Sequence, residues 1–293
     1  MTFVNSGKRY RKIGSTVKGT HMTNEREQYT MGYGPAATAI MAMRTAQSHA
    51  AFFLPYLKPG MSLLDCGCGP GTITAGFAEL VAPAEVVGTE IEESHVAIAR
   101  ENAAKRNVSN IRFEPADIYE LPFADASFDG VFISAVLGNL REPTRGLHEA
   151  YRVLKPGGVI GVKEFDHGGD LLYPPDPAVE KYGELYLRLR RTNGHDPETG
   201  RKIGALLIDA GFGDLNLSAA YESFAGPQAA GGFAQVSAGL LAEGWGEAFI
   251  SRGWATRDEI KEMSNAWGRF SKSSGAVFAA AWCEAVARKP SPH

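Results

Sequence analysis

The sequence predicts an α/β fold in which a mostly parallel sheet of seven strands is covered by helices on both faces. Three observations support it. Apolar runs typical of strands alternate with segments of helical periodicity, and the first such pair is joined by a glycine-rich turn. Polar residues also follow several of these strands directly, at the ends where doubly wound sheets bind ligands.

The glycine-rich turn reads DCGCGPGT over residues 65–72, after the apolar pair Leu63 and Leu64. A helical pattern follows, so the turn brings backbone N–H groups to a helix N-terminus without intervening side chains. A dinucleotide-binding fingerprint requires glycine at the position of Thr72, and a diphosphate is disfavoured beside Asp65. The acid suits a ligand with a cationic amino-acid end.

This turn resembles the first motif, acid-x-Gly-x-Gly-x-Gly, of the class I S-adenosylmethionine-dependent methyltransferases. Asp65, Gly67, Gly69 and Gly71 match it position for position. The similarity covers residues 29–166 well and is closest in look to the ubiquinone, menaquinone and natural-product branch. It implies a doubly wound Rossmann-like fold, S-adenosylmethionine as cofactor, S-adenosylhomocysteine as product, and no metal.

The first elements follow from periodicity. Apolar side chains near helical spacing predict one amphipathic helix over residues 35–57, which Gln47 interrupts. Apolar runs at 84–91, 111–116 and 130–136 predict strands two to four, and a helix over 94–107 joins two of them. A helical face from Leu147 to Leu154 ends at the KPGG sequence of residues 155–158, before a fifth strand at 159–165.

The C-terminal elements are less regular. A proline-rich link at 171–177 precedes a helix over 178–191, a second helix covers 202–210, and strand six covers 215–224. The antiparallel seventh strand is expected at 276–287. About fifty residues separate these two strands, far more than a hairpin uses, which predicts a helical insertion. Thr256 and Glu259 form a capping-box pattern at the start of its last helix.

Four segments follow from this order. Residues 1–28 are a flexible leader, of which 1–21 resemble a vector-derived sequence because GTHM stands at 19–22. Residues 29–170 form the S-adenosylmethionine-binding core. Residues 171–275 form a substrate-side and lid segment interleaved with the last helix and strand six, and 276–293 are the final strand and tail.

Several residues are expected to bind the cofactor. Glu90 lies about 20 residues beyond the glycine turn, where an acid accepts the ribose hydroxyls; the alternative is an exposed acid at a strand end. The resemblance places Asp117 at the adenine amino group. Tyr29 and Tyr33, in an aromatic arm, are candidates for a cation–π contact with the sulfonium, or belong to a loop tucked against the core. The remaining expected contacts are Gly67, Cys68, Gly69, Thr72, Ile91, His95, Ile118, Ser134 and Ala135.

The catalytic candidates follow the fifth strand. His167 lies just past the fifth strand and is the first candidate for a general base, the role that histidine most often has, with Asp166 orienting it or acting directly. Asn139 and His195 are candidates for substrate binding, although a surface-loop position also explains His195. Alignment of a nucleophile with the sulfonium methyl supplies much of the rate, so the base is helpful without being essential.

Composition narrows the remaining choices. The formal charge of −3 and the pI of about 6.2 give no basic field for nucleic acid. Cys66 and Cys68 lack a second Cys or His pair at ligand spacing, so no metal is expected, and the thiols suit a reducing, cytoplasmic environment. The longest apolar stretch, 275–287, is short of the roughly 20 residues that a membrane span needs.

The sequence therefore predicts a methyltransferase that uses in-line SN2 transfer to a small, largely apolar acceptor, at carbon, oxygen or nitrogen, in a setting such as secondary metabolism. The alternatives are an NAD(P)-dependent oxidoreductase on a similar sheet and a non-catalytic cofactor-binding protein. Aromatic residues of the insertion suit a lid, or else a homodimer contact through the lid or the N-terminal arm.

Overall fold

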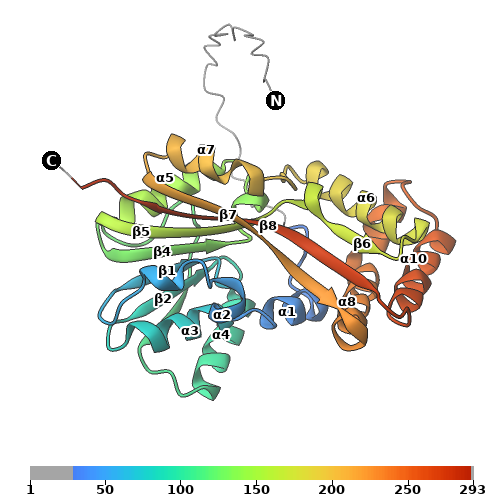
Figure 1. Cartoon of the computed structure of the whole chain (residues 1–293), viewed down its shortest axis with the longest axis horizontal. Coiled ribbons are helices and arrows are strands. Elements are labelled where there is room, and N and C mark those ends of the chain that lie inside the picture. The colour runs from blue at the N-terminus through green and yellow to red at the C-terminus, as the bar shows by residue number, and fades with distance from the viewer. Residues whose placement is uncertain (1–28, 292–293) are drawn as a thin grey trace, which may run out of the picture.

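The computed structural model describes residues 29–291, so the predicted leader lies outside the described residues (Figure 1). The strands are β1 (Leu63–Cys66), β2 (Val86–Glu90), β3 (Ile111–Pro115), β4 (Phe128–Ser134), β5 (Leu154–Phe165), β6 (Leu171–Tyr173), β7 (Gly213–Ala225) and β8 (Val277–Arg288). The α-helices are α1 (Pro35–Ala42), α2 (Ala46–His49), α3 (Thr72–Val81), α4 (Glu93–Lys105), α5 (Pro143–Val153), α6 (Pro177–Thr192), α7 (Ile203–Asp209), α8 (Gly226–Leu240), α9 (Gly246–Ser251) and α10 (Arg257–Phe270).

The strands form one sheet in the order β3-β2-β1-β4-β5-β8-β6, with β7 also paired to β8. β1 to β5 are mutually parallel, and β8 is antiparallel to β5, β6 and β7. This confirms the predicted fold class. The sequence analysis missed β6: in the segment expected to be a plain link, Leu172 pairs with Phe278 of β8.

Alternate residues of the central strands serve the two faces of the sheet. Leu63 packs with Phe77 and Phe132 beneath α2 and α3, whereas the neighbouring Leu64 packs with Leu147 of α5 on the opposite face. In Figure 1, α3 and α4 lie on one side of the sheet, and α5 and α7 lie on the other. Burial on both faces explains why these strands read as continuous apolar runs.

β7 and β8 form a long ribbon that leaves the core and reaches the helical insertion (Figure 1). We call α6, α8, α9 and α10, with the π-helical turn η5 (Leu241–Trp245), the lid. The predicted capping box is present, because Thr256 Oγ1 accepts from Glu259 N at 3.3 Å and Glu259 Oε2 accepts from Thr256 N at 2.8 Å. Trp245 and Trp267 are buried in a separate apolar core of the lid rather than exposed for a partner.

The single helix predicted over residues 35–57 is wrong. α1 ends at Ala42, a new short helix begins at Ala46, and a 3₁₀ turn, η1, covers Leu54–Tyr56. Thr45 causes the break: its side chain accepts a hydrogen bond from Ser48 N, and Ser48 Oγ accepts from Thr45 N, so Thr45 caps a second helix. The break changes the buried face, and Met43, expected in the core, is 52% exposed.

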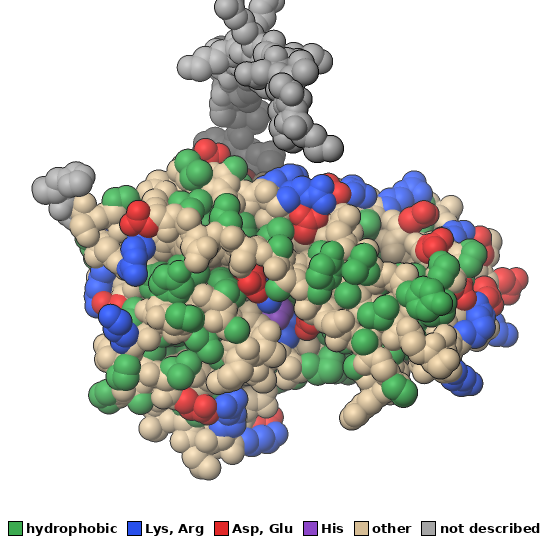
Figure 2. All heavy atoms as spheres, in the orientation of Figure 1, with side chains coloured by type: hydrophobic (Ala, Val, Ile, Leu, Met, Phe, Trp, Pro, Cys, Tyr) green, Lys and Arg blue, Asp and Glu red, His purple; other side chains and the backbone are tan. Residues whose placement is uncertain are grey.

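On the face shown in Figure 2, acidic and basic side chains are interspersed, without one continuous basic field. Large hydrophobic side chains are exposed on β6 and β7, where Leu171, Tyr173, Leu217 and Tyr221 are each more than half exposed. Among residues 29–291, no helix is both long enough and apolar enough to span a bilayer.

Candidate active site

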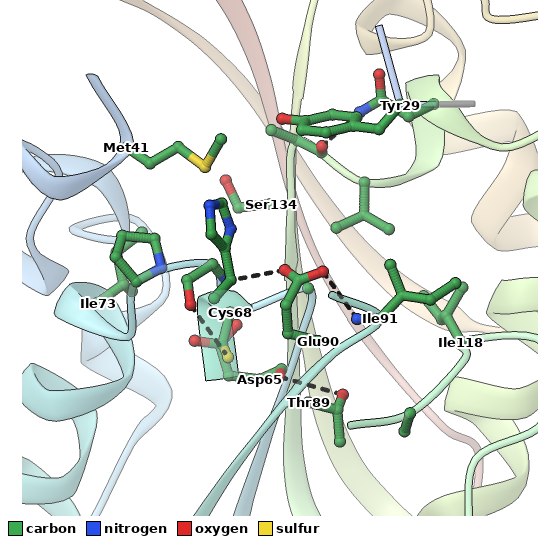
Figure 3. A pocket seen from close by; sticks show the side chains of 18 of the residues that line it. Tyr29, Met41, Asp65, Cys68, Ile73, Thr89, Glu90, Ile91, Ile118 and Ser134 are labelled. Atoms are coloured by element: carbon green, nitrogen blue, oxygen red, sulfur yellow. Dashed lines mark hydrogen bonds between the residues drawn. The ribbon is translucent and has the colours of Figure 1, made fainter. Parts of the chain in front are cut away.

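A cavity opens at the carboxyl ends of β1, β2 and β4, where the predicted cofactor residues come together (Figure 3). All of the residues expected to bind the cofactor line it, namely Tyr29, Tyr33, Asp65, Gly67, Cys68, Gly69, Thr72, Glu90, Ile91, His95, Asp117, Ile118, Ser134 and Ala135. They come from segments spread over more than a hundred residues of sequence. The parallel sheet brings them together because its strand ends share one edge.

The glycine turn depends on its glycines. Gly67, Gly69 and Gly71 have φ values of +73°, +52° and +74°, which residues with a Cβ rarely adopt. A Cβ at Gly67 would overlap Cγ2 of Val136, and one at Gly71 would lie 2.7 Å from Phe113 Cζ. The backbone therefore follows a path that only glycine permits at these positions.

Asp65 is buried at the end of β1, with 3% of its surface exposed. Burial raises the pKa of its carboxyl to about 7; the hydrogen bond from Thr74 opposes this shift and the nearby Glu90 adds to it. The carboxyl is thus poised to gain or lose its proton near neutral pH. A cation placed beside it would favour the ionised form.

Glu90 links the end of β2 to the glycine turn (Figure 3). Its Oε2 accepts from Gly69 N at 3.1 Å, and its Oε1 accepts from Ile91 N at 2.8 Å. These bonds fix the carboxylate at the cavity wall. An exposed surface acid would have no such contacts, so the structure places Glu90 in the cavity rather than at the surface.

The N-terminal arm, residues 29–34, closes one side of this cavity. The rings of Tyr29 and Tyr33 lie 5.2 Å apart, and Tyr33 meets His95 edge-on at 5.1 Å. Burial raises the pKa of the Tyr29 hydroxyl and lowers the pKa of His95. The Tyr29 hydroxyl therefore faces the site in its neutral form.

Thr30 fastens the arm to the lid. Its backbone carbonyl accepts from Trp245 Nε1 at 2.9 Å, and its Oγ1 accepts from Asn193 Nδ2 at 2.9 Å. His195 Nδ1 lies 2.7 Å from the same Oγ1. His195 lines neither this cavity nor the next one, which corrects its expected place among substrate-binding residues. Its ring holds the arm in place through the contact with Thr30.

Asn139, a candidate for substrate binding, lines the first cavity together with the predicted cofactor residues. Its Nδ2 donates to Ala135 O at 2.7 Å, while its Oδ1 and the nearby Ser134 Oγ are buried without hydrogen-bond partners among the described residues. Sequence reasoning also missed Met41 and Arg44, which line this cavity. Recognition of the Thr45 cap was the available signal, since Met41 lies in the last turn of α1 and Arg44 lies in the break that follows it.

A second cavity of about 430 Å³ lies between the sheet and the lid. Its walls are largely aromatic and aliphatic, and the aromatic members are Phe165, Tyr182, Tyr186, Phe224, Phe233, Trp245, Trp267 and Phe278. Arg44 lines both cavities, so the two meet at its side chain. Met31 brings the arm to the second cavity as well.

His167 lines the second cavity, but Asp166 lines neither. The carboxylate of Asp166 accepts from Arg201 Nε at 2.8 Å and Arg201 N at 3.0 Å, which lowers the pKa of Asp166. His167 Nδ1 instead lies 2.8 Å from Asp170 Oδ2. The expectation that Asp166 orients His167 is therefore corrected, and the orienting carboxylate is Asp170.

Among residues 29–291, no group of three or more His, Cys, Asp or Glu side chains has the arrangement of a metal site. Burial raises the pKa values of the Cys66 and Cys68 thiols, so both stay protonated and uncharged. They act as small side chains in the crowded turn.

Comparison with known proteins agrees with this geometry. A family model described as a methyltransferase domain matches residues 57–200. The probable methyltransferase LtbC of Aspergillus luteorubrus is 31% identical over 290 residues, which cover 91% of this chain and 99% of that protein. The ubiquinone/menaquinone biosynthesis C-methyltransferase UbiE of Yersinia enterocolitica is 32% identical over 178 residues, 55% of this chain and 70% of that one. A crystal structure of a putative methyltransferase from Bacillus halodurans has the same fold, with a TM-score of 0.57, 20% identity, and coverage of 82% and 100%.

Proposed function

Since the chain belongs to the methyltransferase domain family and is an S-adenosylmethionine-dependent methyltransferase, we propose that its acceptor is a small, largely apolar organic molecule. The observation that carries this proposal is the second cavity, which is walled by aromatic side chains and meets the cofactor-side cavity at Arg44. Small-molecule sites are typically concave and apolar with few polar groups, and this cavity has that character.

The residues of the first cavity fit the cofactor. The three glycines of the turn place no side chain in the cavity, and the buried Ser134 Oγ and Asn139 Oδ1 lack partners among the described residues. We assign Asp65 to the cationic amino-acid end and Glu90 to the ribose hydroxyls, since a carboxylate accepts hydrogen bonds from both groups. Asp117 is assigned to the adenine amino group.

Apolar and aromatic side chains complete the assignment. Ile91 and Ile118 provide apolar surface for the adenine ring, and Tyr29 and Tyr33 offer π-faces to a sulfonium. When bound, the cofactor supplies a methyl group that carbon, oxygen or nitrogen nucleophiles accept without further activation. The protein's part is to align the acceptor and exclude water, which the arm and lid do by covering the junction of the two cavities.

The relatives support a small-molecule acceptor. UbiE is named for C-methylation in quinone biosynthesis, and LtbC matches this chain over nearly its full length. A nicotinamide-dependent oxidoreductase is overturned by the family match, in agreement with Thr72 in place of the third fingerprint glycine.

Calorimetric titration with S-adenosylmethionine, S-adenosylhomocysteine and NADH tests the cofactor assignment. We expect binding of the first two and no signal from NADH. The acceptor proposal is tested by incubating the protein with S-adenosylmethionine and a library of aromatic, isoprenoid and polyketide-like compounds, with S-adenosylhomocysteine as readout. Product formed only with charged polymers such as RNA or basic protein would contradict a small apolar acceptor.

A further inference from the structure

His167 and Asp170 form a positioned pair at the wall of the second cavity. Asp170 Oδ2 lies 2.8 Å from His167 Nδ1, and Asp170 Oδ1 accepts from Ala281 N of β8 at 2.8 Å. The sheet thus holds the carboxylate, and the carboxylate holds the imidazole. A carboxylate only accepts hydrogen bonds, so the proton of a neutral His167 ring is on Nδ1 and the lone pair is on Nε2.

Packing fixes the ring further. It stacks on Phe165 at 5.0 Å with an interplanar angle of 13°, and it meets Tyr186 of α6 edge-on at 5.4 Å. The His167 side chain is 9% exposed, and its Nε2 has no hydrogen-bond partner among the described residues. A buried nitrogen without a partner is costly unless another molecule supplies one. The only lone pair of the ring is therefore left for a ligand.

Arg44 lies near this pair, at the junction of the two cavities. Its guanidinium carbon is 5.6 Å from the centre of the Phe165 ring, the same ring on which His167 stacks. Its Nε is buried without a hydrogen-bond partner among the described residues, and its nearest carboxylate contact is long, at 3.6 Å to Glu222 Oε2. The cation is thus incompletely compensated where the acceptor would meet the methyl donor.

The carboxylates around the cavity compensate this cation only in part. Asp170 is engaged by His167, and Glu222 faces Arg44 itself. Glu180 and Glu184 of α6 line the cavity but are exposed, so water screens them at its rim. The inner wall therefore combines a proton acceptor, a cation and flat aromatic surfaces.

We propose that the acceptor is a planar phenol or enol that His167 deprotonates and Arg44 holds as the anion, with Asp170 as positioning residue. This deepens the proposed function and rests on it. The acceptor O–H bond breaks, its proton goes to His167 Nε2, and its electron pair stays on the acceptor. That pair, on oxygen or on a conjugated carbon, makes the new bond to the methyl carbon while the carbon–sulfur bond breaks and its electrons stay on sulfur. A carbon methylated in this way afterwards loses its own hydrogen as a proton.

The test uses matched pairs of probes with the protein saturated with S-adenosylhomocysteine. The pairs are 7-hydroxy- and 7-methoxy-4-methylcoumarin, and 4-hydroxy- and 4-methoxycoumarin, a phenol and an enol with their blocked ethers. Absorption spectra report whether a bound hydroxyl probe is ionised, and titrations give its affinity. At a mildly acidic pH, where free 7-hydroxy-4-methylcoumarin is neutral, this probe should bind as the anion, about tenfold or more tighter than its ether, as expected for charged hydrogen bonds. 4-Hydroxycoumarin, which is already an anion in free solution, should show the same preference over its ether in affinity.

His167→Gln and Arg44→Gln should each lower the ionised fraction of the bound hydroxyl probe and weaken its binding about tenfold, while leaving the affinity for the ether unchanged. Asp170→Asn should act like His167→Gln, because the amide donates to Nδ1 and moves the ring proton to Nε2; Asp170→Glu should restore part of the effect. Nitrogen chemical shifts of His167 report this tautomer directly. His148→Gln, at an exposed position on α5, is the matched control and should change nothing.

The outcomes separate the two proposals. Failure of the wild-type protein to bind S-adenosylhomocysteine would contradict the cofactor assignment itself. If the cofactor product binds but hydroxyl probes bind only as neutral molecules, no better than their ethers, or not at all, the phenol or enol acceptor is overturned. Unchanged spectra in the His167 and Arg44 variants would overturn the roles of these residues.

Discussion

Thr74 Oγ1 donates a 2.6 Å hydrogen bond to Asp65 Oδ2, and both side chains are buried behind the glycine turn. The contact spans the turn, because Asp65 lies in β1 and Thr74 lies in the first turn of α3. It gives the carboxyl one fixed partner and leaves its remaining acceptor capacity for a ligand. The protonation of Asp65 and the binding of the cofactor are therefore linked.

Binding of S-adenosylhomocysteine should strengthen as pH rises from 6 to about 7. The raised pKa of Asp65 means that the free protein holds this proton below pH 7, and a ligand ammonium expels it. Affinity should fall by up to about tenfold per pH unit below the pKa. Calorimetry in buffers of different ionisation enthalpy measures the released proton. Asp65→Asn should remove the proton release, and Thr74→Val should shift it to higher pH; release that persists in Asp65→Asn would point to another group.

Glu90→Gln should weaken binding of S-adenosylmethionine by about 1–3 kcal/mol, because the neutral amide is a poorer acceptor for the ribose hydroxyls and for Gly69 N. Titration calorimetry checks the loss. Glu92→Gln is the neighbouring control, at the start of α4 outside the cavity lining. Equal affinities of the Glu90 variant and the wild type would show that Glu90 does not bind the ribose hydroxyls.

Gly67→Ala should abolish measurable cofactor binding. The residue has a φ of +73°, which costs about 1–2 kcal/mol with a Cβ, and the added methyl overlaps Val136. Thermal denaturation and titration with S-adenosylhomocysteine measure the two effects. Gly268→Ala is the matched control: it lies in α10 with open space around its Cα, so it should raise stability by about 0.5–1 kcal/mol. Full binding by Gly67→Ala would show that the turn adapts.

Thr30→Val should destabilise the closed arm by about 1–3 kcal/mol, because Asn193 Nδ2 and His195 Nδ1 would lose their shared partner inside the protein. The expected results are faster proteolysis within residues 29–34 and faster dissociation of the cofactor product. Thr192→Val, at an exposed position on α6, should have neither effect. An arm that resists protease equally in the Thr30 variant would show that Trp245 alone holds it.

The core could be predicted from the sequence because its signals are local and redundant. The central strands β1, β2 and β4 are buried on both faces, so each is an apolar run, and the glycine turn has a backbone that favours glycine. The strand ends, the N-terminal arm and the family resemblance together gave the predicted cofactor residues, all of which line the first cavity. The break at Thr45 was missed because a capping pattern inside an apolar stripe was read as its continuation.

The acceptor side could not be predicted in the same way. Asp170 lies between a 3₁₀ turn and β6, and its role depends on a hydrogen bond that it accepts from Ala281 N, more than a hundred residues away. Asp166 and Asp170 look equivalent beside His167 in sequence. Only the bend at η3 (His167–Gly169) decides that one meets Arg201 and the other meets the imidazole. β6 was missed because a strand of three residues is too short to show the alternation of apolar and polar residues that identifies a strand.

The ribbon of β7 and β8 is continuously paired from Asn216 and Val286 in the core to Ala225 and Val277 beside the lid. The same two strands thus pack in the core of the sheet and line the second cavity through Glu222, Phe224, Phe278 and Ala280. The core and the lid cannot separate as rigid bodies without breaking the pairing of β7 with β8. Heating should therefore unfold both in one cooperative transition. We expect ligands to enter and leave by movement of the arm instead, because a few hydrogen bonds of Thr30, to His195, Asn193 and Trp245, attach it to the rest of the protein.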